Sequence, residues 1–277
     1  MVPKAMRRLL FTASLLLTAA VLRAGDPPRP ATADEMALFK EALRNSAQDT
    51  EHWAYTETSQ LKASKGGNQG ETIVRFDPSK PYGEQYTPLL VEGRAPTERQ
   101  LREYRRKGEK RGVQVARAAA AAKDPDYVPP PPQLKIAGGG VTLDAANPRV
   151  VEAGPDRVVF EVPLQSKRTD IPLEKLQVLA VVDRAARRVE TVSLRVREAF
   201  RMKLIAKVKA GEARLDFTVV DPRFGPVITN LTGDFNVSLL FIPVNGTFTR
   251  TRTEWKRVKS FDERLQVKLG PLQFLDS

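Results

Sequence analysis

Cysteine is absent from this 277-residue sequence, and histidine occurs once, as His52. Without cysteine the chain forms no disulfide, offers no thiolate to a metal or a substrate, and has no attachment residue for a lipid anchor. A single histidine excludes a histidine-rich zinc cluster and a two-histidine proton shuttle. The motifs of nucleophile elbows, phosphate-binding loops, zinc proteases and dinucleotide sites are also missing. The sequence therefore predicts no enzyme, no cofactor and no metal site.

The first 24 residues have the pattern of a secretory signal peptide. Three basic residues precede an uncharged stretch, residues 9–22, and Ala24 offers a cleavage site. The stretch is short for a membrane-spanning helix, and an uncleaved N-terminal anchor is the alternative. The segment carries four basic and no acidic side chains, so its removal lowers the formal charge from +12 to +8. No later segment is apolar enough to predict a membrane span after signal cleavage.

An exported protein without cysteine fits a bacterial periplasm better than a eukaryotic secretory pathway, where disulfides are common. We therefore expect a periplasmic protein of the bacterial envelope, for which nucleic acid is not an expected partner. The rest of the chain, residues 25–277, is expected to form a single β-rich domain. A helical, proline-rich insertion is expected at residues 94–135.

The start of this domain predicts a helix followed by a hairpin. Thr32 and Glu35 match a capping box, so a helix is predicted over residues 34–47. Alternating side chains predict a strand over residues 53–61, and a glycine-rich turn leads to a partner strand at 72–76. The apolar stripe of the helix consists of Met36, Phe39 and Leu43.

The insertion contains a strongly basic segment. Thr97 and Gln100 mark a helix start, and a helix is predicted over residues 97–111, which contain seven Arg and Lys side chains. Residues 116–132 are rich in alanine and then in proline, which predicts a helical tail and a stiff linker. Arg102, Arg105 and Arg106 are the candidate contacts of this helix with an anionic partner.

From residue 134 onward the apolar pattern has a period of two, which predicts a mainly β, α+β fold built on an antiparallel meander. Gly211 predicts a turn between two short strands, and Asn245-Gly246 is the strongest short-range hairpin signal. Alternation also predicts one apolar and one basic face, because residues 192–209 alternate between the two types. The basic face is either solvated or a docking surface for anions. Its candidate contacts are Arg195, Arg197, Lys203 and Lys207.

The first helix with its stripe, the hairpin of residues 53–76 and the strand–turn–strand of residues 181–196 together resemble the periplasmic lipoprotein-carrier fold of LolA, LolB and the sensor domain of RseB. This resemblance implies a curved half-barrel with helices in its mouth, whose concave apolar sheet holds an acyl chain. Residues 76–101 also resemble a segment found in uncharacterised exported bacterial proteins.

The leading hypothesis is a non-enzymatic periplasmic protein that binds a lipid or a lipidated protein in a curved apolar sheet. The expected cavity lining is Leu194, Leu204, Phe217 and Phe241. The alternative is an interaction or scaffolding module of the envelope, which uses the basic helix and sheet face to bind an acidic partner. A hydrolase with paired carboxylates is a third hypothesis, for which no residues stand out.

Overall fold

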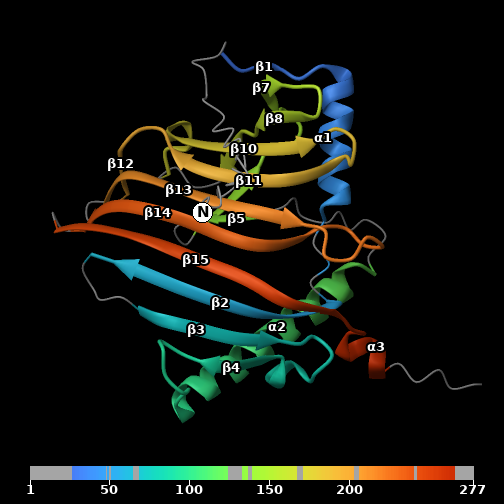
Figure 1. The fold of residues 1–277 in the computed structure, drawn as a ribbon, viewed down its shortest axis with the longest axis vertical. Helices are drawn as coiled ribbons and strands as arrows, with labels where there is room; N and C mark the ends of the chain where they lie inside the picture. Colours follow the sequence, from blue (N-terminus) through green and yellow to red (C-terminus); the bar gives the residue numbers. More distant parts are fainter. Residues whose placement is uncertain are drawn as a thin grey trace, which may run out of the picture.

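The computed structural model describes residues 27–47, 49, 51–64, 69–123, 133–136, 139–166, 171–202, 206–239 and 242–265. Its main feature is an antiparallel sheet of 12 strands that is not closed, accompanied by a three-stranded sheet and three α-helices within this part of the chain (Figure 1). The predicted fold class, mainly β with a curved sheet and helices on it, is confirmed.

The large sheet is a meander whose last strand pairs with the N-terminal hairpin. β15 follows β14 along the chain, and its second neighbour in the sheet is β2. The strands in spatial order are β1 (Arg29–Pro30), β7 (Arg149–Ala153), β8 (Arg157–Glu161), β10 (Leu176–Asp183), β11 (Arg188–Val196), β13 (Ala206–Thr218), β14 (Val227–Leu239), β15 (Ile242–Arg257), β2 (Trp53–Ala63), β3 (Gln69–Phe76) and β4 (Tyr86–Leu90), with β12 (Phe200–Met202) beside β13. The small sheet contains β5 (Gln133–Ile136), β6 (Gly139–Leu143) and β9 (Leu164–Ser166).

Helix α1 (Ala33–Asn45) lies on β10 and β11 and closes the main core. The hydroxyl of Thr32 accepts a hydrogen bond from the Glu35 amide, and the Glu35 carboxylate accepts one from the Thr32 amide, as in the predicted capping box. Phe39 is 1% exposed, and its ring centroid lies 4.8 Å from that of Phe160 on β8. The helix predicted over residues 34–47 is therefore confirmed, and Phe39 and Leu43 of its predicted stripe pack on the core of the sheet together with Leu38 and Ala42.

The register defines one continuous face of the sheet, called here the inner face. One row of directly paired residues crosses five neighbouring strands from β11 to β2. In order it consists of Leu194, Ala213, Gly233, Phe248 and Leu61. Directly paired residues point to the same side of a sheet. The inner face therefore runs from the strands under α1 to the N-terminal hairpin.

Two glycines that predict turns lie inside long strands instead. β13 runs through Gly211, which pairs with Phe235, and β15 runs through Asn245 and Gly246. The turns predicted at these positions are wrong. A Cβ on Gly246 would lie 2.5 Å from the Phe235 ring, so this glycine makes room for a side chain of the neighbouring strand.

Helix α2 (Glu98–Ala121) extends the predicted basic helix by several turns. Thr97 and Gln100, which mark its predicted start, form a capping box. Gly108 and Gly112 are buried against Tyr82 in the short 3-10 helix η1 (Tyr82–Glu84). The predicted linker lies outside the described residues from residue 124 onward.

The other short elements are η2 (Leu173–Lys175) and α3 (Phe261–Leu265). None of the helices in the described part of the chain is long and apolar enough to cross a membrane.

We predict that Gly108→Ala weakens the docking of α2. Alanine normally favours a helix over glycine, but a Cβ at this position would lie 1.8 Å from the Tyr82 carbonyl oxygen. The free energy of unfolding should fall by about 1–3 kcal/mol, as in other overpacked sites. Urea unfolding followed by circular dichroism measures this free energy. The control is Val113→Ala, at a 51% exposed position of the same helix, which should change the free energy of unfolding little. A Gly108→Ala protein that is more stable than the parent would contradict this packing.

Candidate functional site

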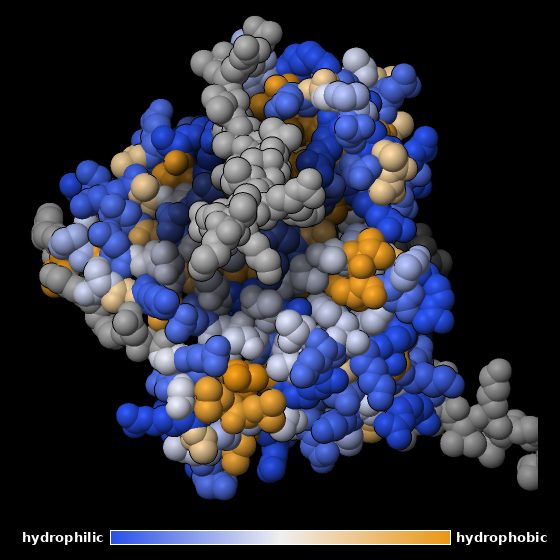
Figure 2. Space-filling view, viewed as in Figure 1, coloured by the Kyte–Doolittle hydropathy of each residue, from blue (hydrophilic) through white to orange (hydrophobic). Residues whose placement is uncertain are grey.

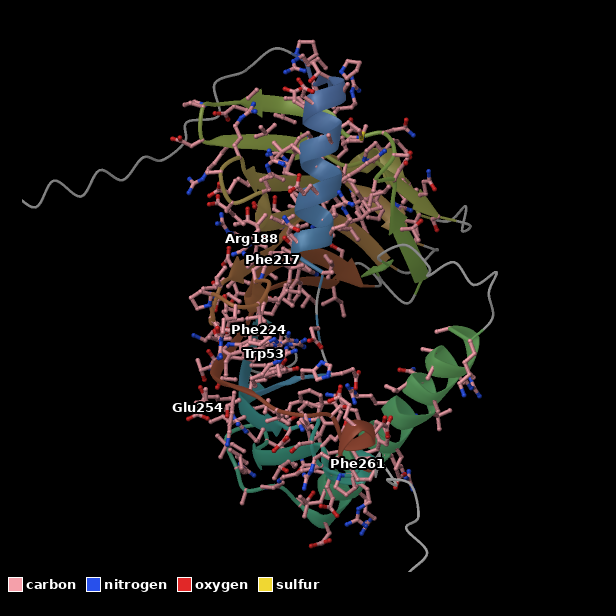
Figure 3. All side chains as sticks on the ribbon, turned by 90° about the vertical axis from the view of Figure 1, so that its right-hand side faces the viewer. Trp53, Arg188, Phe217, Phe224, Glu254 and Phe261 are labelled. Carbon is pink, nitrogen blue, oxygen red and sulfur yellow. The ribbon has the colours of Figure 1, made fainter. Side chains whose placement is uncertain are left out.

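The inner face between the two long helices carries a band of apolar side chains, called here the apolar strip. Helix α1 contacts β10 and β11, whereas α2 contacts η1 and β4, at the other end of the sheet. Figure 3 shows the two helices at opposite ends of the molecule. The strip side chains are all partly exposed, and they are Val208, Leu215, Leu231, Phe235, Val237, Val244, Phe248 and Leu61.

Two reciprocal phenylalanine–glycine pairs form the centre of the strip. Phe235 pairs with Gly246, and Phe248 pairs with Gly233. A Cβ on either glycine would lie 2.5 Å from the ring of its partner, so each ring lies across the neighbouring backbone. Aromatic rings that cover strand glycines in this way fix the register. The rings also present a flat apolar surface on the inner face.

The predicted cavity residues that the structure describes lie beside this strip and not within it. Leu194 and Phe217 are on the inner face, where both pack against the core cluster under α1. Leu204 and Phe241 lie outside the described residues. The four positions therefore stay a prediction, and the strip next to them was not predicted as such.

Beyond the strip, the inner face becomes aromatic. Six rings from five segments follow one another with centroid separations of 4.8 to 6.0 Å. In order they are Phe224, Trp53, Trp255, Tyr55, Phe76 and Tyr86, and we call them the aromatic row. Figure 3 labels Phe224 and Trp53, which lie beside each other near the middle of the molecule.

Four cations lie against this row. The Arg257 guanidinium is 4.2 Å from the Phe224 centroid, and that of Arg252 is 4.8 Å from the Tyr55 centroid. The other two come from α2: the Arg111 guanidinium over Phe76 at 5.1 Å and the Lys107 ammonium over Tyr86 at 4.2 Å. Cation–π contacts of this kind contribute about 0.5–2 kcal/mol each. The two contacts made by Lys107 and Arg111 help to hold α2 above the row.

A cleft of about 690 Å³ separates α2 from the row. Burial raises the pKa of the Tyr55 hydroxyl to about 12, and it also raises the pKa of Tyr86. Desolvation by the cleft walls lowers the pKa of Lys107, although much of that side chain is exposed. The lining residues are Tyr55, Phe76, Tyr86, Glu103, Arg106, Lys107, Lys110, Arg111 and Gln114. The basic helix was the sequence signal for this cleft, but nothing in the sequence indicated that aromatic side chains would face it.

The two predicted groups of basic residues lie on different sides of the sheet. Arg102 and Arg105 are exposed on α2, and Arg106 lines the cleft. Arg195, Arg197 and Lys207 are on the outer face, because their neighbours Leu194, Val196 and Val208 are on the inner one. Lys203 lies outside the described residues. The structure does not bring the two groups together.

Part of the outer charge is neutralised by neighbours. A guanidinium nitrogen of Arg197 lies 2.5 Å from a Glu161 oxygen, and Arg195 donates to Gln177. Lys207 is exposed, directly opposite Arg201, and forms no ion pair with a described residue. The surface in view in Figure 2 is mainly hydrophilic, with separate small hydrophobic areas. These contacts favour a solvated outer face around Arg195 and Arg197.

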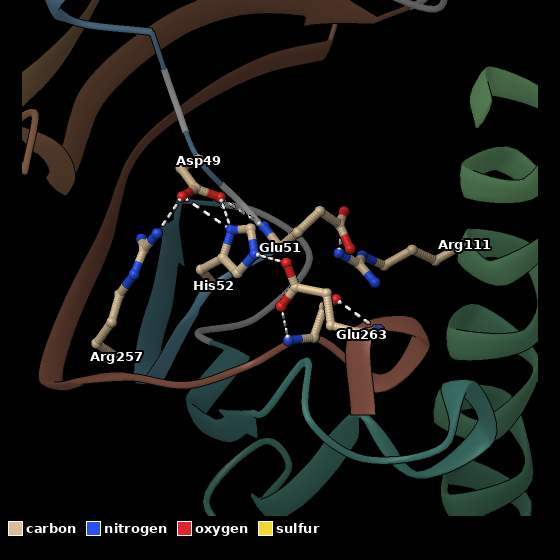
Figure 4. A network of polar contacts seen from close by, with 7 residues as sticks. Asp49, Glu51, His52, Arg111, Arg257 and Glu263 are labelled. Carbon is tan, nitrogen blue, oxygen red and sulfur yellow. Dashed lines mark hydrogen bonds and ion pairs between the residues drawn. The ribbon is translucent and has the colours of Figure 1, made fainter. Parts of the chain in front are cut away.

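The single histidine lies in a polar network that joins three segments (Figure 4). His52 Nδ1 lies 2.7 Å from Asp49 Oδ1, and Nε2 lies 2.9 Å from Glu263 Oε1 on α3. Asp49 also pairs with Arg257 at 2.7 Å, and the adjacent Glu51 pairs with Arg111 of α2. The hydrogen bond to Glu263, together with that to Asp49, raises the pKa of His52. Across the described residues, no cluster of His, Asp and Glu side chains could hold a metal ion.

Comparison with known proteins gave one similar solved structure and no family assignment. No family model matches the chain, and no curated protein matches it. The solved structure is a LolA superfamily protein, NE2245, from Nitrosomonas europaea. It is 13% identical, with coverage of 84% of this chain and 96% of that one, and the TM-score is 0.35. At this score the two structures correspond only loosely.

We predict that stability falls above neutral pH through His52. Because its pKa is raised in the folded state, the histidine contributes fully below its ordinary pKa of 6.5 and loses this contribution as pH rises through the folded value. Urea unfolding followed by tryptophan fluorescence, between pH 6 and 9, measures this loss. His52→Gln should flatten the dependence in that window, and equal slopes for both proteins would contradict the role of this network.

Proposed function

We propose that this protein binds a lipid or lipidated ligand on the inner face of its sheet, without covalent chemistry and without turnover. The supporting observation is the apolar strip, whose eight side chains are partly exposed on one continuous face between α1 and α2. Ligand sites are typically apolar, largely preformed surfaces with a few polar groups at the side. The cations and tyrosines beside the strip are such polar groups.

The energetics favour an acyl chain as the ligand. Each methylene that moves from water onto an apolar surface contributes about 0.8 kcal/mol, so a long chain needs no specific hydrogen bond. The register of β13, β14 and β15 holds the strip in place before a ligand arrives. The protein therefore loses little conformational entropy when the ligand binds.

The pattern of the first 24 residues and the absence of cysteine support a periplasmic place of action. The resemblance of the chain to the lipoprotein-carrier fold implies the same class of ligand. Leu194, Leu204, Phe217 and Phe241 stay proposed contacts at the α1 side of the strip. We propose carriage or storage of the ligand, not its conversion.

Leu231→Asn should weaken lipid binding at least tenfold. This substitution places an amide among apolar side chains, and losing one large buried apolar contact costs about 1.5–3 kcal/mol. Displacement of a fluorescent fatty acid measures the affinity, and native mass spectrometry of the purified parent protein should find bound acyl lipid. Thr232→Asn, at the next position and on the outer face, is the matched control. A parent protein that carries no lipid and binds no fatty acid would reject the proposal.

A second candidate function is docking of an acidic envelope partner on α2. The observation in its favour is the row formed by Arg102, Arg105 and Arg106, which are exposed and form no ion pair with the described residues. Two other cations of this helix have an acidic partner: Arg99 pairs with Glu103, and Arg111 pairs with Glu51.

Reversing all three charges, as Arg102→Glu, Arg105→Glu and Arg106→Glu, should abolish a salt-sensitive pull-down from an envelope extract. The corresponding triple Arg→Lys variant keeps the charge and should retain the partner. Electrostatic contacts between exposed groups weaken with salt, so 0.5 M NaCl should also release it. Unchanged capture by the charge-reversed protein would exclude this surface.

A further inference from the structure

We propose that the cleft between α2 and the aromatic row binds a phosphate group. The two sources of such a group are a phospholipid headgroup and free phosphate. The first source rests on the proposed function, because it requires acyl chains on the apolar strip. The phosphate site itself consists only of residues of the cleft and does not depend on the strip.

Three cations of the cleft, Arg106, Lys107 and Lys110, form no ion pair with a described residue. They lie within four positions of one another on α2, and like charges at helical spacing destabilise a helix by a few tenths of a kcal/mol. The acids nearby are engaged elsewhere: Glu103 pairs with Arg99, and Glu57 pairs with Arg250 and Arg252. The cleft therefore carries an uncompensated positive charge.

Lys107 is the cation that is placed most specifically. Its ammonium lies 4.2 Å from the Tyr86 centroid and 5.7 Å from the Tyr104 centroid, so two rings flank it. Desolvation by these surroundings lowers its pKa. An anion beside the ammonium would remove this penalty, because opposite charges attract more strongly where water is partly excluded.

Phosphate fits this set of donors better than a carboxylate does. The guanidinium of Arg106 can donate two parallel hydrogen bonds, and the ammonium groups of Lys107 and Lys110 donate to further oxygens. The hydroxyls of Tyr55 and Tyr86 keep their protons at neutral pH, since burial raises the pKa of each, and they can act as donors. A carboxylate offers two oxygens in one plane. A phosphate carries four oxygens in a tetrahedral arrangement, of which two are non-bridging in a phospholipid and three in glycerol phosphate, so it can meet donors that approach from several directions.

The inner face leads from the strip to the cleft. Along β2 it changes from Leu61 through Ser59 and Glu57 to Tyr55, while Arg250 and Arg252 follow Phe248 along β15. Six residues of strand span about 20 Å. An amphiphile with its acyl chains on the strip would therefore place its headgroup toward the charged, aromatic end. This order of apolar, charged and aromatic surfaces favours a phospholipid as the source.

The test compares three probes on the full chain after signal removal: inorganic phosphate, sn-glycerol 3-phosphate and a short-chain phosphatidylglycerol. Calorimetry measures each affinity for the parent protein and two variants. Lys107→Met should weaken all three probes at least tenfold. Arg117→Met removes one charge from an exposed position of α2 outside the cleft and should leave the affinities within twofold of the parent.

The outcomes separate the two sources. If the phospholipid binds at least tenfold more tightly than glycerol phosphate, and Leu231→Asn removes only this gain, the source is a lipid headgroup. If the acyl chains add nothing, the cleft binds free phosphate, so the phosphate proposal stands while lipid binding fails. If no probe binds, or Lys107→Met and the Arg117→Met control lose affinity equally, the phosphate site is rejected. Fatty-acid binding by Lys107→Met then tests the strip separately. If Lys107→Met melts at a lower temperature than the parent protein, the double variant Arg106→Gln, Lys110→Gln takes its place.

Discussion

The pairing of β2 with β15 is the interaction on which the rest of the structure depends. Ten register pairs, from Ala63 with Gly246 to Trp53 with Arg257, join segments that are about 200 residues apart in the sequence. Closing so long a loop costs conformational entropy, which the ladder of backbone hydrogen bonds and the side chains on it offset. Through this pairing the hairpin, η1 and α2 extend the face that α1 covers at its other end. Without it the apolar strip and the aromatic cleft would belong to two separate surfaces.

An irregularity in the same pair positions the aromatic row. The register shifts between Thr253 and Lys256, and Glu254 has a φ of 53°, a left-handed conformation that is uncommon for this residue type. The Thr56 hydroxyl donates to the Glu254 carboxylate at 2.5 Å, which helps to hold the bulge. The bulge places Trp255 against both Trp53 and Tyr55. A local distortion of one strand therefore makes the row continuous, and the row in turn carries the cations that hold α2.

Local signals predicted the elements well, and they failed where a neighbouring strand decides the conformation. Both capping boxes, the first hairpin and the alternating strands under α1 were predictable, because each depends on residues a few positions apart. Gly211 and Gly246 were misread as turns. A glycine can serve a turn, or it can leave room for a facing ring as Gly246 does for Phe235, and the sequence around it does not distinguish the two. For the site, the sequence identified the apolar face and the basic helix, but not the aromatic row, whose six rings come from residues 53 to 255.

The sequence by itself determined which side chains share a face of each strand and which segment is a basic helix. These properties follow from periods of two and of 3.6 residues, which are local. Only the tertiary structure decided that α2 lies over tyrosines, that Arg195 and Arg106 are on different sides of the sheet, and that His52 joins Asp49 to Glu263. Those outcomes depend on which distant strands pair and in what register. The pairing depends on the total burial and hydrogen bonding of the whole sheet. Residues far apart in the sequence contribute to this total, so a short segment cannot predict it.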